Sequence, residues 1–170
     1  MNKRIDVINN RFESPIVYKH FWSPKVLDNL NEKIDTWRSG KSMGGNLNVQ
    51  LQYNKWPPRL WGDSGPILLI NLDSDKELIE EVKNELNVIY DTSILTRFNC
   101  MMHICLKGSY IAWHDDGGHS FVCNTYLNQE VWPWNWGGAA IYKDKHGKLT
   151  AEFPENNKMM VQCGHFNREH

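Results

Sequence analysis

The spacing of apolar residues predicts an amphipathic helix near the start of the chain. Residues 24–38 place an apolar side chain at every third or fourth position, which is one face of a helix. Ser23 supplies an N-cap, Pro24 suits the first turn, and Gly40 ends the pattern. Before this helix, Ile16-Val17-Tyr18 alternates loosely and predicts a short strand.

A second amphipathic helix is predicted after a long segment that is rich in glycine and proline. Ser74-Asp75-Lys76-Glu77 has the form of a capping box and opens a helix to about Leu86. Its buried face is predicted to hold Leu78, Ile79, Val82 and Leu86. The segment between the helices, residues 40–66, predicts a loop with one short strand near Asn48–Tyr53. Such long loops are often lids or binding loops, and a surface loop without a role is the alternative.

From residue 93 the apolar period changes from that of a helix to that of a strand. Residues 93–106 predict one long strand, or two strands that meet at a bulge. Short strands with turns between them follow at 120–126, 139–142, 148–153 and 158–162. Helices followed by short antiparallel strands predict an α+β fold whose β part is a sandwich or a jelly roll (double-stranded β-helix).

Length and charge restrict the class of protein. A chain of 170 residues predicts a single domain, with a helical or lid segment over about 1–92 and a core over about 93–170. The net charge of −1 gives no basic footprint for nucleic acid or for an anionic membrane. The start of the chain has no signal-peptide pattern, and the apolar runs are too short to span a bilayer. The sequence therefore predicts a soluble, cytoplasmic protein.

The four cysteines form no CxxC pair, so neither a disulfide framework nor a zinc site is indicated. They predict mostly buried, reduced thiols.

Candidate chemistry centres on His114 and Asp116. Residues i and i+2 of a strand point to the same face, so this imidazole and carboxylate would converge. With a second histidine they would make the facial triad that suits iron(II). The other histidines are His20, His103, His119, His146, His165 and His170. A late return of the chain favours His165 or His170, with a mild preference for His170.

Several motifs in order resemble the prolyl hydroxylase-like branch of the iron(II)/2-oxoglutarate-dependent dioxygenases. The resemblance covers about Ile16 to His170 and includes N-terminal helices packed on one sheet of the jelly roll. The matching motifs are His114-Asp115-Asp116, Tyr126-Leu127-Asn128, Trp136-Gly137-Gly138, and Pro154 with Asn157. The resemblance implies that His114, Asp116 and His170 bind iron(II), with 2-oxoglutarate as cosubstrate and ascorbate as a possible reductant.

The chain differs from the family at the residues that bind the cosubstrate. The family pairs the distal carboxylate of 2-oxoglutarate with a basic residue on the strand after the last histidine, and this strand is expected to be missing here. Arg97 or Lys143 could substitute, and the alternative for each is a solvated charge at a strand edge. The family also often has a cosubstrate-contacting tyrosine near the position of Cys105. This role would fall to Tyr110, to Tyr126 or to no residue of the chain.

By resemblance, the expected activity is hydroxylation of an unactivated C–H bond with release of succinate and carbon dioxide. Trp113, Trp132, Trp134 and Trp136 are the expected rim of the cleft, which would take a prolyl peptide or a small molecule. The main alternative is a cupin-like metal-binding or ligand-binding domain without oxygenase activity. A zinc hydrolase is less favoured, since no general base lies beside the motif. The sequence does not set the oligomeric state.

Overall fold

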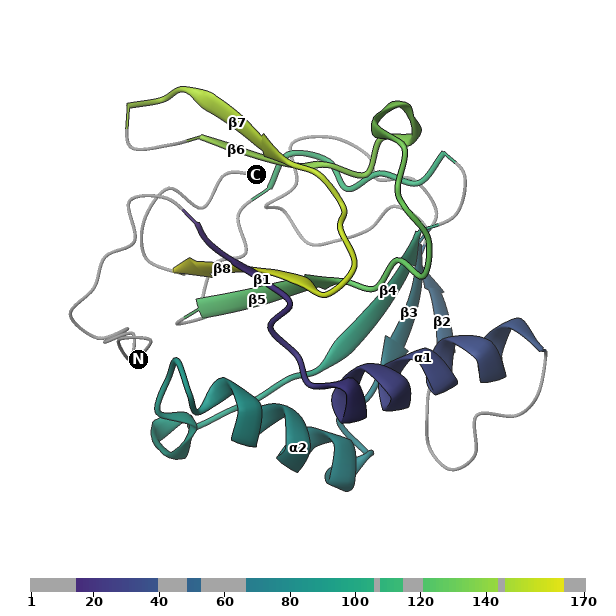
Figure 1. Ribbon diagram of the computed structural model, residues 1–170, viewed down its shortest axis with the longest axis vertical. Helices are drawn as coiled ribbons and strands as arrows, with labels where there is room; N and C mark the ends of the chain where they lie inside the picture. The colour runs from purple at the N-terminus through teal and green to yellow at the C-terminus, as the bar shows by residue number, and fades with distance from the viewer. Residues whose placement is uncertain are drawn as a thin grey trace. The chain divides into compact units, whose positions relative to one another are not determined.

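The computed structural model describes residues 15–39, 49–52, 67–105, 108–114, 121–143 and 146–163. Figure 1 labels the helices and strands of these residues. The chain divides into two compact units of interleaved segments. The first unit comprises residues 1–5, 22–55 and 64–110, and the second comprises 6–21, 56–63 and 111–170.

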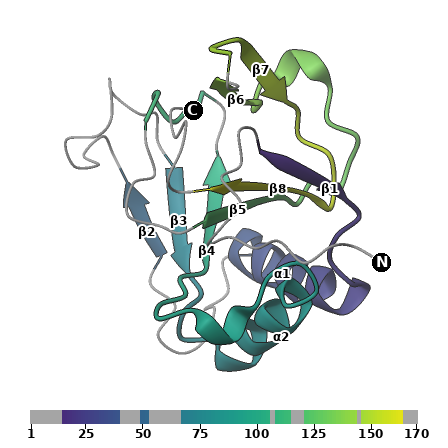
Figure 2. The ribbon, with the colours of Figure 1, turned by 90° about the vertical axis from the view of Figure 1, so that its left-hand side faces the viewer.

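The first unit contains two antiparallel helices that lie side by side, α1 (Pro24–Arg38) and α2 (Lys76–Leu86) (Figure 2). The predicted N-cap of α1 is confirmed, because the Ser23 hydroxyl accepts a hydrogen bond from the Val26 amide. Glu85 of α2 in turn accepts hydrogen bonds from the amide and the hydroxyl of Ser23, with an N···O distance of 2.8 Å for the amide. Glu85 in the last turn of α2 therefore stabilises the N-terminus of α1.

The N-cap of α2 differs from the predicted capping box by one residue. Asp75, rather than Ser74, caps the helix, and its carboxylate accepts a hydrogen bond from the Leu78 amide at 3.1 Å. Lys33 of α1 lies 2.7 Å from the other Asp75 oxygen, and this ion pair lowers the pKa of the Asp75 carboxyl. A tertiary partner thus favours the aspartate as the cap. The buried face of α2 is as predicted: Leu78, Ile79, Val82 and Leu86.

The first unit also contains an antiparallel sheet in the order β2-β3-β4. Its strands are β2 (Val49–Gln52), β3 (Ile67–Asn71) and β4 (Met101–Cys105). Strand β2 lies where the sequence predicts one, whereas the central strand β3 was not predicted. Its apolar run is short and does not alternate, which fits a strand that is buried on both faces.

The long strand predicted over 93–106 is wrong over most of its length. A 3-10 turn, η1 (Thr92–Ile94), is capped by Asp91, and only residues 101–105 pair as β4. The Cys100 carbonyl still accepts a hydrogen bond from the Leu72 amide at 2.9 Å, but the Cys100 amide donates to the Asp73 carboxylate at 2.7 Å. Local side-chain bonds therefore replace the strand that alternation alone would favour.

The second unit contains a sheet in the order β1-β8-β5, with β1 (Ile16–Lys19), β5 (Phe121–Tyr126) and β8 (Lys158–Cys163). Both pairings are antiparallel, and β8 is central. Met159, Met160 and Val161 of β8 are at most 1% exposed, so both faces of the sheet are covered. The strand that precedes both helices pairs with the last described strand, so the predicted order of helices and then strands holds only in part.

A two-stranded hairpin completes the second unit, with β6 (Ala140–Lys143) and β7 (Leu149–Glu152). All described strand pairings in both units are antiparallel, which agrees with the predicted α+β class. The jelly roll itself stays a prediction. Within the described residues, no helix combines the length and apolar character needed to cross a membrane.

Removing the Glu85 carboxylate should destabilise the helix pair. We expect Glu85→Ala to lower the free energy of unfolding by on the order of 2 kcal/mol, because two charge-assisted hydrogen bonds to Ser23 are lost. Glu80→Ala is the matched control, since its ion pair with Lys83 is exposed and contributes about 0.3 kcal/mol. Urea titration followed by circular dichroism measures both. Equal effects would contradict the capping role of Glu85.

The Asp75–Lys33 pair should make stability depend on pH. The folded pKa of Asp75 lies below its ordinary value of 3.8, so its contribution is present above that pH and is lost as the pH falls through the folded pKa. We expect Asp75→Asn to be less stable than wild type at pH 7 and to converge with it in acid. Urea midpoints from pH 7 to pH 3 measure the difference. A gap that stays constant would exclude the carboxylate as its source.

Candidate metal centre

His114 is a buried imidazole whose hydrogen bonding fixes the ring. The residue is 8% exposed, and its Nδ1 lies 2.8 Å from the Ala112 carbonyl oxygen. A carbonyl only accepts, so Nδ1 carries a proton, and in the neutral imidazole the lone pair is then on Nε2. A metal-binding histidine usually has this arrangement, with its second nitrogen donating to a carbonyl or a carboxylate. His114 is therefore held in the tautomer that a metal ligand needs.

The backbone around His114 is not the regular strand that was predicted. Residues 109–112 have no regular structure, and His114 forms only an isolated β-bridge. The other two predicted ligands, Asp116 and His170, lie outside the described residues, as does the alternative His165. Within the described part of the chain, no group of three or more possible ligands lies together. The structure therefore describes one of the three predicted ligands.

Trp113 connects the motif segment with the hairpin. The Lys143 ammonium lies 5.3 Å from the centroid of the Trp113 ring, a distance at which cation and ring attract. Lys143 ends β6, where the buried Tyr142 points to the opposite face. His114 follows Trp113 directly and therefore lies beside the hairpin.

The hairpin also contacts one face of the sheet β1-β8-β5. Tyr126 and Lys158 are opposite each other in the β5–β8 ladder and share this face. The Lys158 ammonium lies 3.2 Å from the Glu152 carboxylate of β7, and the Tyr126 hydroxyl donates to the Glu152 carbonyl at 3.5 Å. Both views show the hairpin on one side of the sheet (Figures 1 and 2). The hairpin thus contacts both Trp113, the residue before His114, and the face of the sheet that carries Tyr126.

The comparison with solved structures finds a crystal structure of a Pseudomonas putida prolyl-4-hydroxylase. The two chains are 17% identical and align with a TM-score of 0.59, over 93% of this chain and 84% of the other. The protein has a prolyl-hydroxylase-like fold. No family model and no curated protein matches the sequence.

Three of the four tryptophans that were predicted to form the cleft rim, Trp132, Trp134 and Trp136, lie on one loop. In the 3-10 turn η2 (Trp134–Trp136), Trp134 is 79% exposed and Trp136 is 61% exposed. The Trp132 indole donates to the Gly137 carbonyl at 2.7 Å and packs edge-on against Trp136. Gly138 has φ +77°, and a Cβ there would lie 3.3 Å from Pro154. The Trp-Gly-Gly motif therefore holds exposed aromatic rings in a fixed conformation.

The two tyrosines considered for the cosubstrate lie in different units. Tyr110 is 54% exposed and belongs to the first unit, whereas His114 belongs to the second. Tyr126 is half-buried in β5, on the face that the hairpin contacts. Of the two, the structure places only Tyr126 in the unit of His114. Arg97, one of the two basic candidates, is an exposed residue of the first unit that donates to Asn99.

The cysteines agree largely with the predicted reduced thiols. Cys100, Cys105 and Cys123 are free, and Cys163 has no described side chain. Burial raises the pKa of the Cys123 thiol to about 12 and that of Cys100 to about 11. Cys105 is exposed, which corrects the prediction of burial for this residue. High thiol pKa values disfavour the thiolate that metal binding requires.

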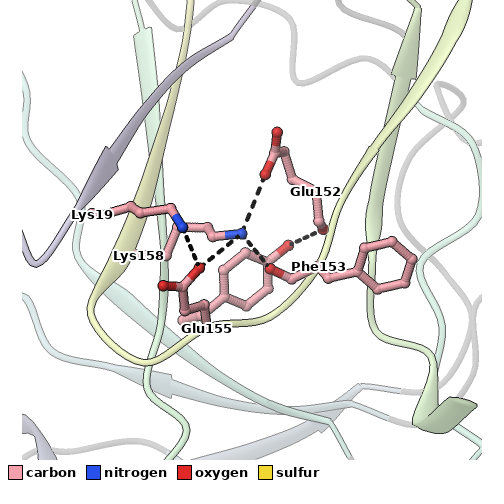
Figure 3. A network of polar contacts seen from close by, with 6 residues as sticks. Lys19, Glu152, Phe153, Glu155 and Lys158 are labelled. Carbon is pink, nitrogen blue, oxygen red and sulfur yellow. Dashed lines mark hydrogen bonds and ion pairs between the residues drawn. The ribbon is translucent and has the colours of Figure 1, made fainter. Parts of the chain in front are cut away.

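Lys158 is a buried cation that the sequence did not single out. Its side chain is 8% exposed and is neutralised by Glu152 and by Glu155, whose carboxylate lies 3.6 Å away (Figure 3). The ammonium also donates to the Phe153 carbonyl at 2.8 Å. Lys19 of β1 forms the outer part of the network at 3.2 Å from Glu155 and lowers the pKa of that carboxyl. Lys158 therefore fixes the chain between β7 and β8.

Replacing Lys158 should destabilise the second unit more than replacing Lys19. Lys158→Met leaves the Glu152 carboxylate and the Phe153 carbonyl without the Lys158 ammonium and leaves Glu155 with Lys19 alone, and we expect a loss of about 2 kcal/mol. Lys19→Met is the control, because its ion pair is exposed and contributes at most about 0.5 kcal/mol. Urea denaturation measures both variants. A smaller effect for Lys158→Met than for Lys19→Met would exclude this structural role.

Proposed function

We propose that the protein is an iron(II)- and 2-oxoglutarate-dependent oxygenase that hydroxylates an unactivated C–H bond. One observation carries the proposal: His114 is buried in the tautomer of a metal ligand, in a chain with a prolyl-hydroxylase-like fold. In this proposal His114, Asp116 and His170 hold the metal. The fold in this proposal is the jelly roll of that family, with the N-terminal helices packed on one sheet.

The chemistry of the proposed ligands fits iron(II). Two imidazoles and one carboxylate form the facial triad of non-haem iron(II) oxygenases, which leaves open coordination positions. When bound, iron(II) would activate dioxygen as the oxidant of both the substrate and 2-oxoglutarate, which loses carbon dioxide and becomes succinate, and ascorbate would serve as a reductant. The bond between His114 and the Ala112 carbonyl would orient the imidazole and increase its basicity toward the metal. The low exposure of His114 itself would limit the access of water to the site.

The exposed tryptophan loop supports a substrate with a flat, apolar surface. Trp134 and Trp136 present rings beside the uncharged segment 131–141, so this rim would favour an uncharged group. We propose a peptide or a small molecule as substrate, with a prolyl residue as the first group to test. Trp113, fixed by Lys143, and Trp132 would complete the rim.

Uncoupled turnover tests the proposed activity without knowledge of the substrate. The protein is purified without metal and supplied anaerobically with iron(II) and 2-oxoglutarate. Oxygen is then added, and succinate is measured. Succinate formation that needs all three additions is the expected result. Metal binding with neither 2-oxoglutarate binding nor succinate formation would favour the cupin-like alternative.

Substitution of the proposed ligands should abolish metal binding and leave the fold intact. For His114→Ala and for Asp116→Ala we expect iron(II) affinity to fall by at least about a hundredfold, since even outer-shell changes cost 10- to 100-fold. Calorimetric titration measures affinity, and circular dichroism measures the fold.

His165→Ala and His170→Ala form the matched pair for the third ligand. We expect only His170→Ala to lose the metal. Loss in His165→Ala alone would reassign the ligand, and full affinity in His114→Ala would overturn the metal centre.

A further inference from the structure

Two side-chain amides lie on one face of the sheet β1-β8-β5. Asn124 of β5 is opposite Met160, and Gln162 of β8 is opposite Val122, so all four share a face. The Asn124 amide donates to the Gln162 carbonyl oxygen at 3.4 Å. Both amides are half-buried, and Met160 between them is fully buried. The pair is therefore a polar group in apolar surroundings.

The amide pair lies on the face that the hairpin contacts. Residues 122, 124 and 126 alternate to the same side of β5, as do 158, 160 and 162 of β8. Lys158 and Tyr126 on this side contact Glu152 of the hairpin. Through Lys143 the same hairpin contacts Trp113, next to His114. The amides therefore lie on the face of the sheet that this hairpin contacts, and the hairpin in turn contacts the residue before His114.

The amides are unusual at these positions. Asparagine is depleted in strands, where β-branched and aromatic residues pack better. The backbone ladder between β5 and β8 is complete without these side chains. A cross-strand amide bond contributes little to a sheet that already has this ladder. The cost of placing two amides beside Met160 therefore indicates a binding role.

We propose that the Asn124–Gln162 pair hydrogen-bonds the distal carboxylate of the 2-oxo acid. The inference rests on the proposed function, because it assigns a ligand group of that same site. The oxo and adjacent carboxylate oxygens of 2-oxoglutarate would bind the metal, so its distal carboxylate would be left for the protein to bind.

The pair has the donors that a carboxylate requires. Each amide nitrogen carries two N–H groups, and the bond between the amides uses one of them. The Gln162 N–H groups thus remain to donate, and the bond that its oxygen accepts strengthens them as donors. Hydrogen bonds from neutral donors to an ionised acceptor are stronger than those between neutral groups. A carboxylate can therefore be held here by amides.

Two ligands that differ only at the distal group provide the test. 2-Oxoglutarate carries the distal carboxylate, and 2-oxopentanoate has a methyl group in its place. Anaerobic calorimetric titration of the iron(II)-loaded protein gives both dissociation constants without turnover. The ratio of the two constants isolates the distal group from chelation at the metal.

Gln162→Leu should weaken the affinity for 2-oxoglutarate by about 10- to 100-fold, as expected for the loss of hydrogen bonds to a charged group. The affinity for 2-oxopentanoate should stay unchanged. Asn124→Leu should act in the same direction with a smaller effect. Gln162→Glu keeps the size of the side chain but opposes the carboxylate with a like charge, so its loss should exceed that of Gln162→Leu. Thr125→Val is the control, since Thr125 lies on the opposite face of β5 and should alter neither constant.

The outcomes separate this inference from the proposed function. If Gln162→Leu loses affinity equally for both ligands, or for neither, the assignment of the amides is wrong. The proposed oxygenase activity would still stand. Stronger binding of 2-oxoglutarate by Gln162→Glu also overturns it. If iron-loaded wild type binds neither acid, the proposed function fails and this inference fails with it. Urea midpoints of all variants confirm that the compared proteins are folded.

Discussion

The central position of β8 in its sheet determines the arrangement of the second unit. Its ladders with β1 and β5 fix the register, and Met159, Met160 and Val161 cover both faces with buried side chains. Because the side-chain period of a strand is two, a slip of one residue would move Lys158 and Gln162 to the other face. The contacts with the hairpin depend on this register.

The hairpin β6-β7 contacts both this sheet and the segment that carries His114. At one end Glu152 binds the buried Lys158, and at the other Lys143 lies over Trp113. A buried ammonium is stable only with anionic partners, so Glu152 and Glu155 constrain the chain between β7 and β8. The Ala112 carbonyl fixes the His114 ring within its own segment. Local and long-range contacts together place the candidate ligand.

Sequence patterns predicted the structure correctly where the interacting residues are close together in the chain. Ser23 and Pro24 marked the start of α1, and the apolar period marked the buried face of α2. The hairpin and β5 lie close to their predicted bounds. Prediction failed where a distant partner competes with the local pattern. Lys33 favours Asp75 over Ser74 as a cap, and Asp73 takes the Cys100 amide that a longer strand would have used.

By itself, the sequence determined both helices, the antiparallel strands of the second unit and His114 as the first candidate ligand, because these follow from periodicity, capping and short motifs. Only the tertiary structure decided that β1 pairs with β8, that Lys158 is buried among carboxylates, and that Tyr126 rather than Tyr110 shares the unit of His114. It also brought Asn124 and Gln162 together, 38 positions apart in the chain. No local pattern encodes such pairs, because strand register depends on contacts between residues that are distant in sequence.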